Sequence, residues 1–219
     1  MYQIFIENAS AFLEATVVTL KLTTVSLLLA MVIGLVIAFC KISKSRVLYS
    51  IAQLYITVIR GTPLIVQLMF LYFGIIKLVV LPAFWAGSLA LAIHAGAYIA
   101  EIFRGAIQSI STGQMEAARS VGMSKTLAMR RIILPQAFKR AVPPLGNQFI
   151  IGLKDSSLVA YLGVSEIYGT ALTEQAANFM PLETYLVAGM YYLVLVVIFT
   201  YLVNKLEIKL DVEKGGEVS

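Results

Sequence analysis

Long apolar stretches without charge constrain this chain more than any other feature of its sequence. Leu22–Cys40 and Tyr185–Val203 contain no Asp, Glu, Lys or Arg, and the slightly shorter Phe84–Ala100 has none either. Because an α-helix rises about 1.5 Å per residue, about 20 such residues cross the apolar core of a bilayer. Each of these stretches therefore predicts a membrane-spanning helix.

Two further apolar regions, Leu48–Val80 and Ala141–Leu162, are interrupted by polar residues or prolines. The interruptions are Arg60, Gly61, Thr62 and Pro63 in the first region, and Pro143, Pro144, Lys154 and Asp155 in the second. We interpret both regions as irregular spans. With them the sequence predicts an all-α membrane protein with five transmembrane helices.

The basic residues predict how the chain is oriented, because they mark the cytoplasmic side of a membrane protein. They follow the first, third and fifth predicted spans. The groups are Lys41, Lys44 and Arg46; Arg104, Arg119, Lys125, Arg130, Arg131, Lys139 and Arg140; and Lys205, Lys209 and Lys214. We therefore place segment 1–15 outside the cell, a transmembrane domain at 16–207, and a tail at 208–219 in the cytoplasm.

Composition excludes several functions. Only 13% of the residues are charged and 59% are hydrophobic, whereas soluble domains are about a quarter charged. The topology explains the net charge of +5. The long cytoplasmic segment has only Phe103 and Phe138 for base stacking, so no nucleic-acid partner is expected. Cys40 and His94 are too few for a metal centre, and no phosphate-binding loop is present, which predicts no catalytic site, metal or cofactor.

The most informative segment is the cytoplasmic loop 111–135. Ser111 and Gln114 have the spacing of a capping box, and a short alanine-bearing helix follows them. Gly122 can end that helix in a left-handed conformation, and Ser124 can cap a second one. Small side chains would let the first helix enter a groove on another protein, with Met115 and Val121 as apolar contacts. From physics alone, an amphipathic linker on the membrane surface is an equal alternative.

The spacing of the loop residues resembles the coupling motif of the membrane subunits of bacterial ABC importers. The residues in register are Glu116, Ala117, Ala118, Gly122, Ile132, Leu134 and Pro135. Three other runs look like the polar amino acid uptake branch of that family, closest to permeases of the glutamine type. They are 60–67, 97–105 and 143–148, the last followed by 154–158.

This resemblance implies a fold, partners and a function. The fold would be the type I permease fold, with a cytoplasmic coupling helix between the third and fourth spans. The chain would pair with itself or a sister permease in the bacterial inner membrane. It would bind cytoplasmic ATPase subunits, which use ATP and Mg²⁺, and receive a polar amino acid, glutamine first, from an extracytoplasmic binding protein. The alternative is an ATP-independent channel or secondary carrier, which needs no docking helix.

Polar residues at membrane depth are the candidates for the substrate pathway. Gln67 can bond a substrate or a neighbouring helix, and His94 can be structural or line the pathway together with Tyr98, one turn further along. Asp155 can bind a substrate ammonium or form an ion pair at the outer end of its span. Its neighbours Ser156 and Ser157 can bind a carboxylate.

Two charged residues have simpler readings. Arg60 stands just before the Gly-Thr-Pro break and either extends towards the cytoplasm or takes part in the pathway. We favour the first of these readings. Glu101 and Arg104 are three residues apart, which predicts a salt bridge on one helix.

Overall fold

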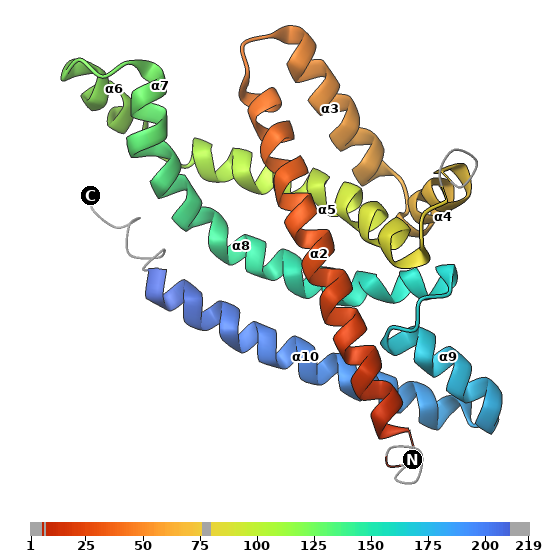
Figure 1. Ribbon diagram of the computed structural model, residues 1–219. Helices are drawn as coiled ribbons and strands as arrows, with labels where there is room; N and C mark the ends of the chain where they lie inside the picture. The colour runs from red at the N-terminus through yellow and green to blue at the C-terminus, as the bar shows by residue number, and fades with distance from the viewer. Residues whose placement is uncertain (1–5, 7, 76–79, 211–219) are drawn as a thin grey trace.

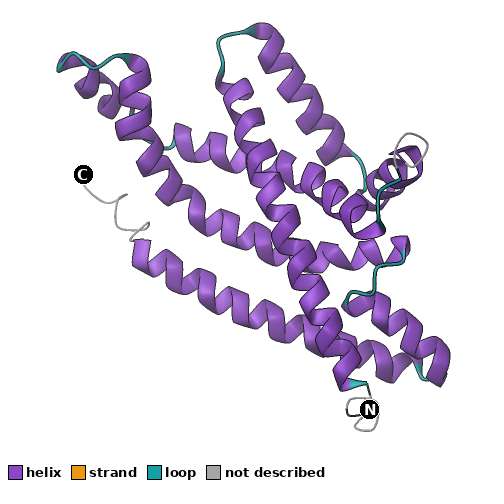
Figure 2. Ribbon diagram, viewed as in Figure 1, coloured by secondary structure: helices purple, strands orange, loops and turns teal. Residues whose placement is uncertain are grey.

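The computed structural model describes residues 6, 8–75 and 80–210, and every regular element in those ranges is a helix (Figure 1, Figure 2). The elements are α2 (Ala9–Ile42), α3 (Arg46–Gly61), α4 (Leu64–Ile75), α5 (Ala83–Gln108), α6 (Thr112–Ser120), α7 (Lys125–Ala128), the π-helix η1 (Met129–Ile133), α8 (Leu134–Asp155), the 3₁₀-helix η2 (Ser156–Leu162), α9 (Ile167–Asn178) and α10 (Pro181–Leu210). The predicted all-α class is thus confirmed for these residues. Most of the predicted C-terminal tail, residues 211–219, lies outside them.

Helices α2 and α5 form the most extensive contact of the bundle. The face of α2 that is buried carries mostly small residues at helical spacing: Ala15, Thr19, Leu22, Thr23, Ser26, Ala30, Gly34 and Ala38. Small side chains allow close approach of helix backbones, which drives packing where the surroundings are as apolar as the helices. A Cβ added to Gly34 would lie 2.6 Å from Cγ2 of Ile99 on α5. The close contact between α2 and α5 therefore requires glycine at position 34.

Among the described residues, α2, α5 and α10 are each long and apolar enough to cross a membrane. Helices α3 and α4 pass the same test only as a bent pair. Helix α8 has the length of a span but carries charges at both ends, including Lys139, Arg140 and Asp155. The predicted count of five spans thus depends on α8 and the bent pair, and it stays a prediction.

The break in the second predicted span is sharper than expected. Helices α3 and α4 meet at 109° between Gly61 and Leu64, so the described part of the predicted span Leu48–Val80 is two helices; residues 76–79 lie outside the described residues. Thr62 is extended (φ −121°, ψ 146°) and its side chain bonds back to the carbonyl of Val58. This conformation follows from Pro63, which disfavours helical backbone at the preceding residue.

The prolines of the fourth predicted span do not interrupt it. Pro143 and Pro144 lie inside α8, which continues from Leu134 to Asp155. Each proline removes one backbone hydrogen bond and normally costs about 3 kcal/mol in a helix interior. On either side of the pair, Ala141 and Leu145 are buried in the hydrophobic core, and this packing offsets the loss.

A buried carboxylate ties three helices together at the end of the molecule that holds α9. Glu166 has no exposed surface and caps α9 by accepting the backbone N–H of Gly169 at 2.7 Å. It also accepts a hydrogen bond from the Tyr192 hydroxyl of α10. Thr19 of α2 accepts the N–H of Ile167 at 3.2 Å. No local sequence pattern predicts the burial of Glu166, because that burial depends on helices distant along the chain.

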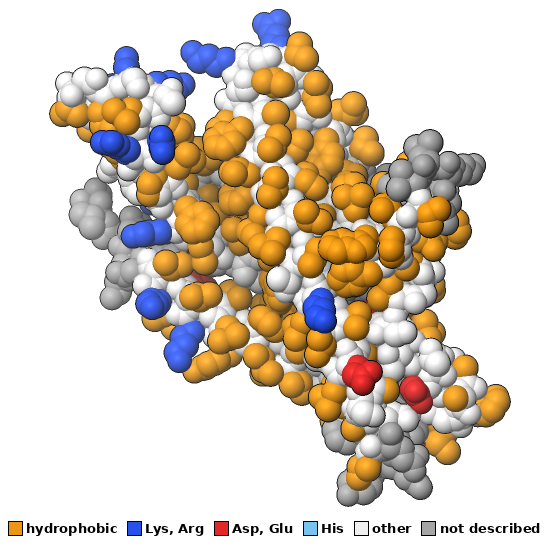
Figure 3. Space-filling model, in the orientation of Figure 1, with side chains coloured by type: hydrophobic (Ala, Val, Ile, Leu, Met, Phe, Trp, Pro, Cys, Tyr) orange, Lys and Arg blue, Asp and Glu red, His pale blue; other side chains and the backbone are white. Residues whose placement is uncertain are grey.

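The charged side chains gather at different ends of the molecule. In Figure 3 most of the visible Lys and Arg side chains lie over the end that carries α6, α7 and the top of α2. The most prominent acidic side chains in that view lie towards the opposite end, near α9. Between them the surface over α2 is largely hydrophobic, as expected for a lipid-facing helix.

Candidate functional site

Residues 111–135, which we call the coupling hairpin after their predicted role, begin and turn where the sequence predicts. The Ser111 side chain caps α6, although it accepts from Gly113 (3.3 Å) and not from Gln114 as a capping box would. Gly122 has φ +87°, and the N–H of Met123 bonds to the carbonyl of Ala118 at 3.1 Å. This is the expected left-handed end of the helix.

The second half of the hairpin has an unexpected wide turn. Ser124 caps α7 by accepting the N–H of Leu127 at 3.2 Å, as predicted. After Ala128, the backbone changes to the π-helix η1, which leads directly into α8. A π-helical turn within a longer helix is often found at functional sites. No local sequence signal predicts this turn.

Helix α6 has one exposed face and one face that packs on its own chain, whereas the sequence predicts that its small residues face a partner. Glu116 and Ala117 are exposed, and Val121 is 79% exposed, so these residues are free to meet a partner. Ala118 is only 3% exposed, and Met115 packs on the core of its own chain. Met115 is only partly buried, so its expected contact with a partner stays a prediction. Part of its side chain is used internally, because the hairpin folds back on the bundle.

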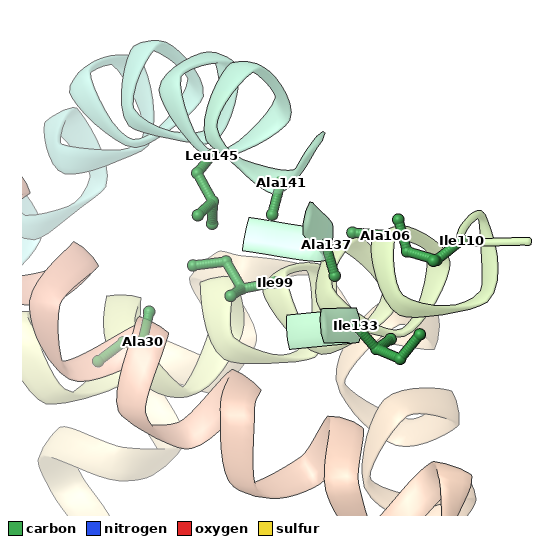
Figure 4. Packing of buried hydrophobic residues seen from close by; sticks show 9 residues of the cluster. Ala30, Ile99, Ala106, Ile110, Ile133, Ala137, Ala141 and Leu145 are labelled. Carbon is green, nitrogen blue, oxygen red and sulfur yellow. The ribbon is translucent and has the colours of Figure 1, made fainter. Parts of the chain in front are cut away.

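A continuous apolar cluster joins the hairpin to the helices that form the bundle. Figure 4 shows Ile99 and Ala106 of α5, and Ile110 just after its end, near Ile133 of η1 and side chains of α8. The buried members are Ala30, Ala92, Ile99, Ala106, Ile110, Ile133, Ala137, Ala141 and Leu145, with Ile132 packed against them. Because protein interiors are close-packed, the hairpin is in direct apolar contact with α5 and α8.

Gln67 holds the break between α3 and α4. Its amide nitrogen lies 2.7 Å from the carbonyl oxygen of Ile59, 3.0 Å from that of Thr62 and 2.7 Å from the Thr62 hydroxyl. The carbonyls at the end of a helix lack partners within it, and here Gln67 supplies them. Of the two readings left open for Gln67, the geometry matches the bond to a neighbouring helix.

His94 is oriented by the same amide. The Gln67 nitrogen faces acceptors, so its oxygen faces Nδ1 of His94 at 3.0 Å, and Nδ1 must donate. In a neutral ring the other nitrogen is then an acceptor. The His94 and Tyr98 rings lie 5.2 Å apart, on one face of α5 as predicted. The guanidinium of Arg60 lies 5.2 Å from the centre of the Tyr98 ring.

A cleft of about 390 Å³ opens beside Tyr98. We call it the polar cleft; it lies between the end of α3, the middle of α5 and α8. Its lining residues are Arg60, Tyr98, Glu101, Ile102, Pro144, Asn147, Gln148 and Ile151. Its volume falls within the usual range for sites that hold small molecules. Arg60 and Glu101 give it charges of both signs.

Sequence reasoning missed three residues of this cleft. Glu101 was assigned to a salt bridge with Arg104, and that bridge is present at 2.6 Å. The same carboxylate, however, also lines the cleft. Asn147 and Gln148 fall within a run that resembles the family, but only the packing of α8 on α5 brings them opposite Glu101.

Asp155 lies in a second, much smaller cavity. That cavity has a volume of about 20 Å³, enough for one water molecule, and His94 and Gln148 line it as well. Gln148 thus borders both hollows. Ser156 and Ser157 line neither, and their hydroxyls donate to the carbonyls of Leu153 and Lys154.

The chain belongs to the family described as binding-protein-dependent transport system inner membrane component, whose model matches residues 30–212. It is therefore a permease subunit of an ATP-binding cassette importer in the inner membrane. It is a transport component and not an enzyme, because members of this family leave ATP hydrolysis to a separate subunit.

Curated relatives match nearly the full chain. The arginine transport system permease protein ArtQ of Bacillus subtilis is 39% identical over 200 residues, covering 90% of this chain and 91% of the relative. The nopaline transport system permease protein NocM of Agrobacterium fabrum is 38% identical, covering 93% and 88%. The glutamine transport system permease protein GlnP of Escherichia coli is 36% identical, covering 91% and 93%.

Solved structures share the fold. A crystal structure of an amino acid ABC transporter with histidines matches with a TM-score of 0.89 and 38% identity, covering 95% of this chain and 98% of that one. An inward-facing structure of the MetNI methionine ABC transporter matches with a TM-score of 0.79, covering 92% and 97%. Its identity is 18%, so this second likeness concerns the fold alone.

Proposed function

We propose that this chain translocates a polar amino acid into the cytoplasm. The observation that carries the proposal is the polar cleft, which brings Arg60 and Glu101 together at one opening between helices of a permease. A free amino acid carries a carboxylate and an ammonium group. Charged groups at membrane depth are costly and are usually kept for such a task.

Each polar lining residue has a role in this proposal. Arg60 binds the carboxylate, because a guanidinium offers paired donors to both oxygens. Glu101 binds the ammonium group, and the amides of Asn147 and Gln148 bond to the polar side chain. Asp155 and His94 lie beyond Gln148 and form the next polar contacts along the path. Glutamine as the substrate stays a prediction, since relatives named for arginine, nopaline and glutamine are about equally similar.

The coupling hairpin would transmit work from a separate ATPase subunit. In this proposal the exposed face of α6, with Glu116, Ala117 and Val121, enters a groove of that subunit, which holds ATP and Mg²⁺. The apolar cluster then carries the movement to α5 and α8, whose residues line the polar cleft. Ala118, Gly122, Ile132, Leu134 and Pro135 maintain the shape of the hairpin. Substrate shifts the balance between inward and outward states only through different affinities for them.

The remaining parts of the proposal concern assembly and orientation. Two permease subunits, identical or sister chains, would enclose the path, because a few spans per chain are too few to surround it. An extracytoplasmic binding protein would deliver the amino acid. The N-terminus would lie outside and the C-terminus inside, in keeping with the basic side chains around α6 and α7.

Reconstituted transport tests the function. The complex of this chain with its ATPase and binding protein is placed in proteoliposomes, and uptake of radiolabelled glutamine, arginine and leucine is followed. We expect uptake of a polar amino acid that requires ATP on the side of the ATPase subunit. Uptake without ATP or without the ATPase would favour a channel or secondary carrier. Equal uptake of leucine would contradict the role of the polar cleft.

A further inference from the structure

A groove separate from the polar cleft runs between the ends of α2, α5 and α8. It has a volume of about 390 Å³ and is lined mainly by apolar side chains, among them Leu35, Phe39, Phe103 and Phe138. Leu35 and Phe39 are 40% and 39% exposed, and Phe138 is 60% exposed. The proposed transport cycle places no substrate or partner in this groove, although Leu134 and Pro135 at its edge belong to the hairpin.

The groove continues into a second hollow that is basic. This hollow, of about 340 Å³, shares Phe39, Arg130 and Leu134 with the first and adds Lys125 and Met129. Among residues 8–75 and 80–210, no acidic side chain lines either hollow. Within the described ranges, neither Lys125 nor Arg130 forms an ion pair. The combined surface is thus apolar at one end and carries two cations at the other, neither of them paired with an acid of the described part of the chain.

The position of the groove suits a lipid of the inner leaflet. Phe39 lies in the last turn of α2, next to Lys41 at the basic end of the molecule. Phospholipids of the cytoplasmic leaflet are partly anionic and attract basic residues close to the membrane surface. Basic pockets between membrane helices on that side bind lipid head groups.

We propose that an anionic phospholipid occupies this surface, with an acyl chain between Phe39, Phe103 and Phe138 and its phosphate on Arg130 and Lys125. The proposal rests on the orientation given under the proposed function. A lipid fits both halves of the surface at once, since it joins a long apolar chain to a negative group. The π-helix η1 matters here because it places Arg130 at the junction of the two hollows.

Photolabelling tests this site in the intact transporter complex. The complex is reconstituted in phosphatidylcholine vesicles with a trace of phosphatidylglycerol that carries a photoreactive acyl chain, and labelled peptides are identified by mass spectrometry. We expect labels on the segments that contain Phe39, Phe103 and Phe138. Unlabelled phosphatidylglycerol should compete and phosphatidylcholine should not. Equal competition by both lipids would overturn the proposal.

Charge variants distinguish a specific lipid site from non-specific attraction of anionic lipid to a basic surface. Lys125→Gln and Arg130→Gln should each weaken labelling about fivefold, and the double variant about 25-fold, because each cation near the surface contributes to the affinity. Arg131→Gln is the matched control, since Arg131 is a neighbouring exposed cation that lines neither hollow. Equal losses in Arg131→Gln would contradict a specific site.

The ATPase is the competing occupant, and it is tested directly. Labelling is repeated on the permease purified without its ATPase. We expect the same labelled segments in both preparations, whereas labelling only in the absence of the ATPase would assign the surface to that subunit. The measurement needs neither ATP nor substrate, so failure of the lipid site and failure of amino acid uptake are separate results.

Discussion

The coupling hairpin and the polar cleft are built in different ways. The hairpin is a local structure, since Ser111, Gly122 and Ser124 set its ends through bonds to residues no more than a few positions away. The cleft is assembled from α3, α5 and α8, which are far apart along the chain. The comparison teaches that local capping signals specify the shape of the hairpin, whereas the packing of distant helices specifies the shape of the cleft.

The largest expected effect concerns the inward face of the hairpin. Ala118→Asp places a charge at a site that is 3% exposed, and a buried unpaired charge costs several kcal/mol. We expect the hairpin to become sensitive to limited proteolysis and uptake to fall at least 100-fold. Ala117→Asp, on the exposed face, should keep the hairpin resistant although it weakens ATPase binding. Equal proteolysis of both variants would show that α6 does not fold back as described.

The next effect concerns the turn. Gly122→Val forces a β-branched residue into φ +87°, which costs about 1–2 kcal/mol or more, while no atom lies within 4 Å to clash with the side chain. Co-purification of the ATPase should therefore fall about tenfold. Gly113→Ala is the control, because Gly113 is inside α6 and alanine favours a helix. If Gly122→Val binds the ATPase normally, the left-handed turn is not needed for coupling.

A smaller effect is expected in the cleft. Glu101→Gln removes the negative charge that we assign to the substrate ammonium, so the KM for uptake should rise about tenfold, the value of one charge-assisted hydrogen bond. Arg104→Gln breaks the same salt bridge without altering the lining of the cleft. It should change KM less than twofold. Similar KM values in the two variants would assign Glu101 to the salt bridge alone.

The smallest effect on uptake is expected at Gln67. Gln67→Leu leaves the carbonyls of Ile59 and Thr62 without a donor and frees the His94 ring, a loss of about 1–3 kcal/mol in stability. Thermal unfolding in detergent should begin at a lower temperature, while KM changes only a few fold. Gln53→Leu, which removes an exposed bond within α3, is the control. A large rise in KM without loss of stability would instead favour direct contact with substrate.

The features that could be predicted from sequence are those that depend on neighbouring residues. The caps at Ser111 and Ser124 and the glycine turn were readable because each depends on its immediate neighbours. The break before Pro63 was predicted, but its 109° bend was not, since the Gln67 bonds that hold it reach across the break and to another helix. The course of α8 through Pro143 and Pro144 was missed for the same reason, because its compensation lies in tertiary packing.

The continuity of α7, η1 and α8 has a mechanical consequence. From Lys125 to Asp155 the backbone stays helical, a rod of about 45 Å at the usual rise per residue. One end starts beside the glycine turn and the other reaches the small cavity at His94. On the proposed coupling to an ATPase, we expect this segment to work as a lever, in which a tilt at the hairpin end displaces Asp155 at the other end.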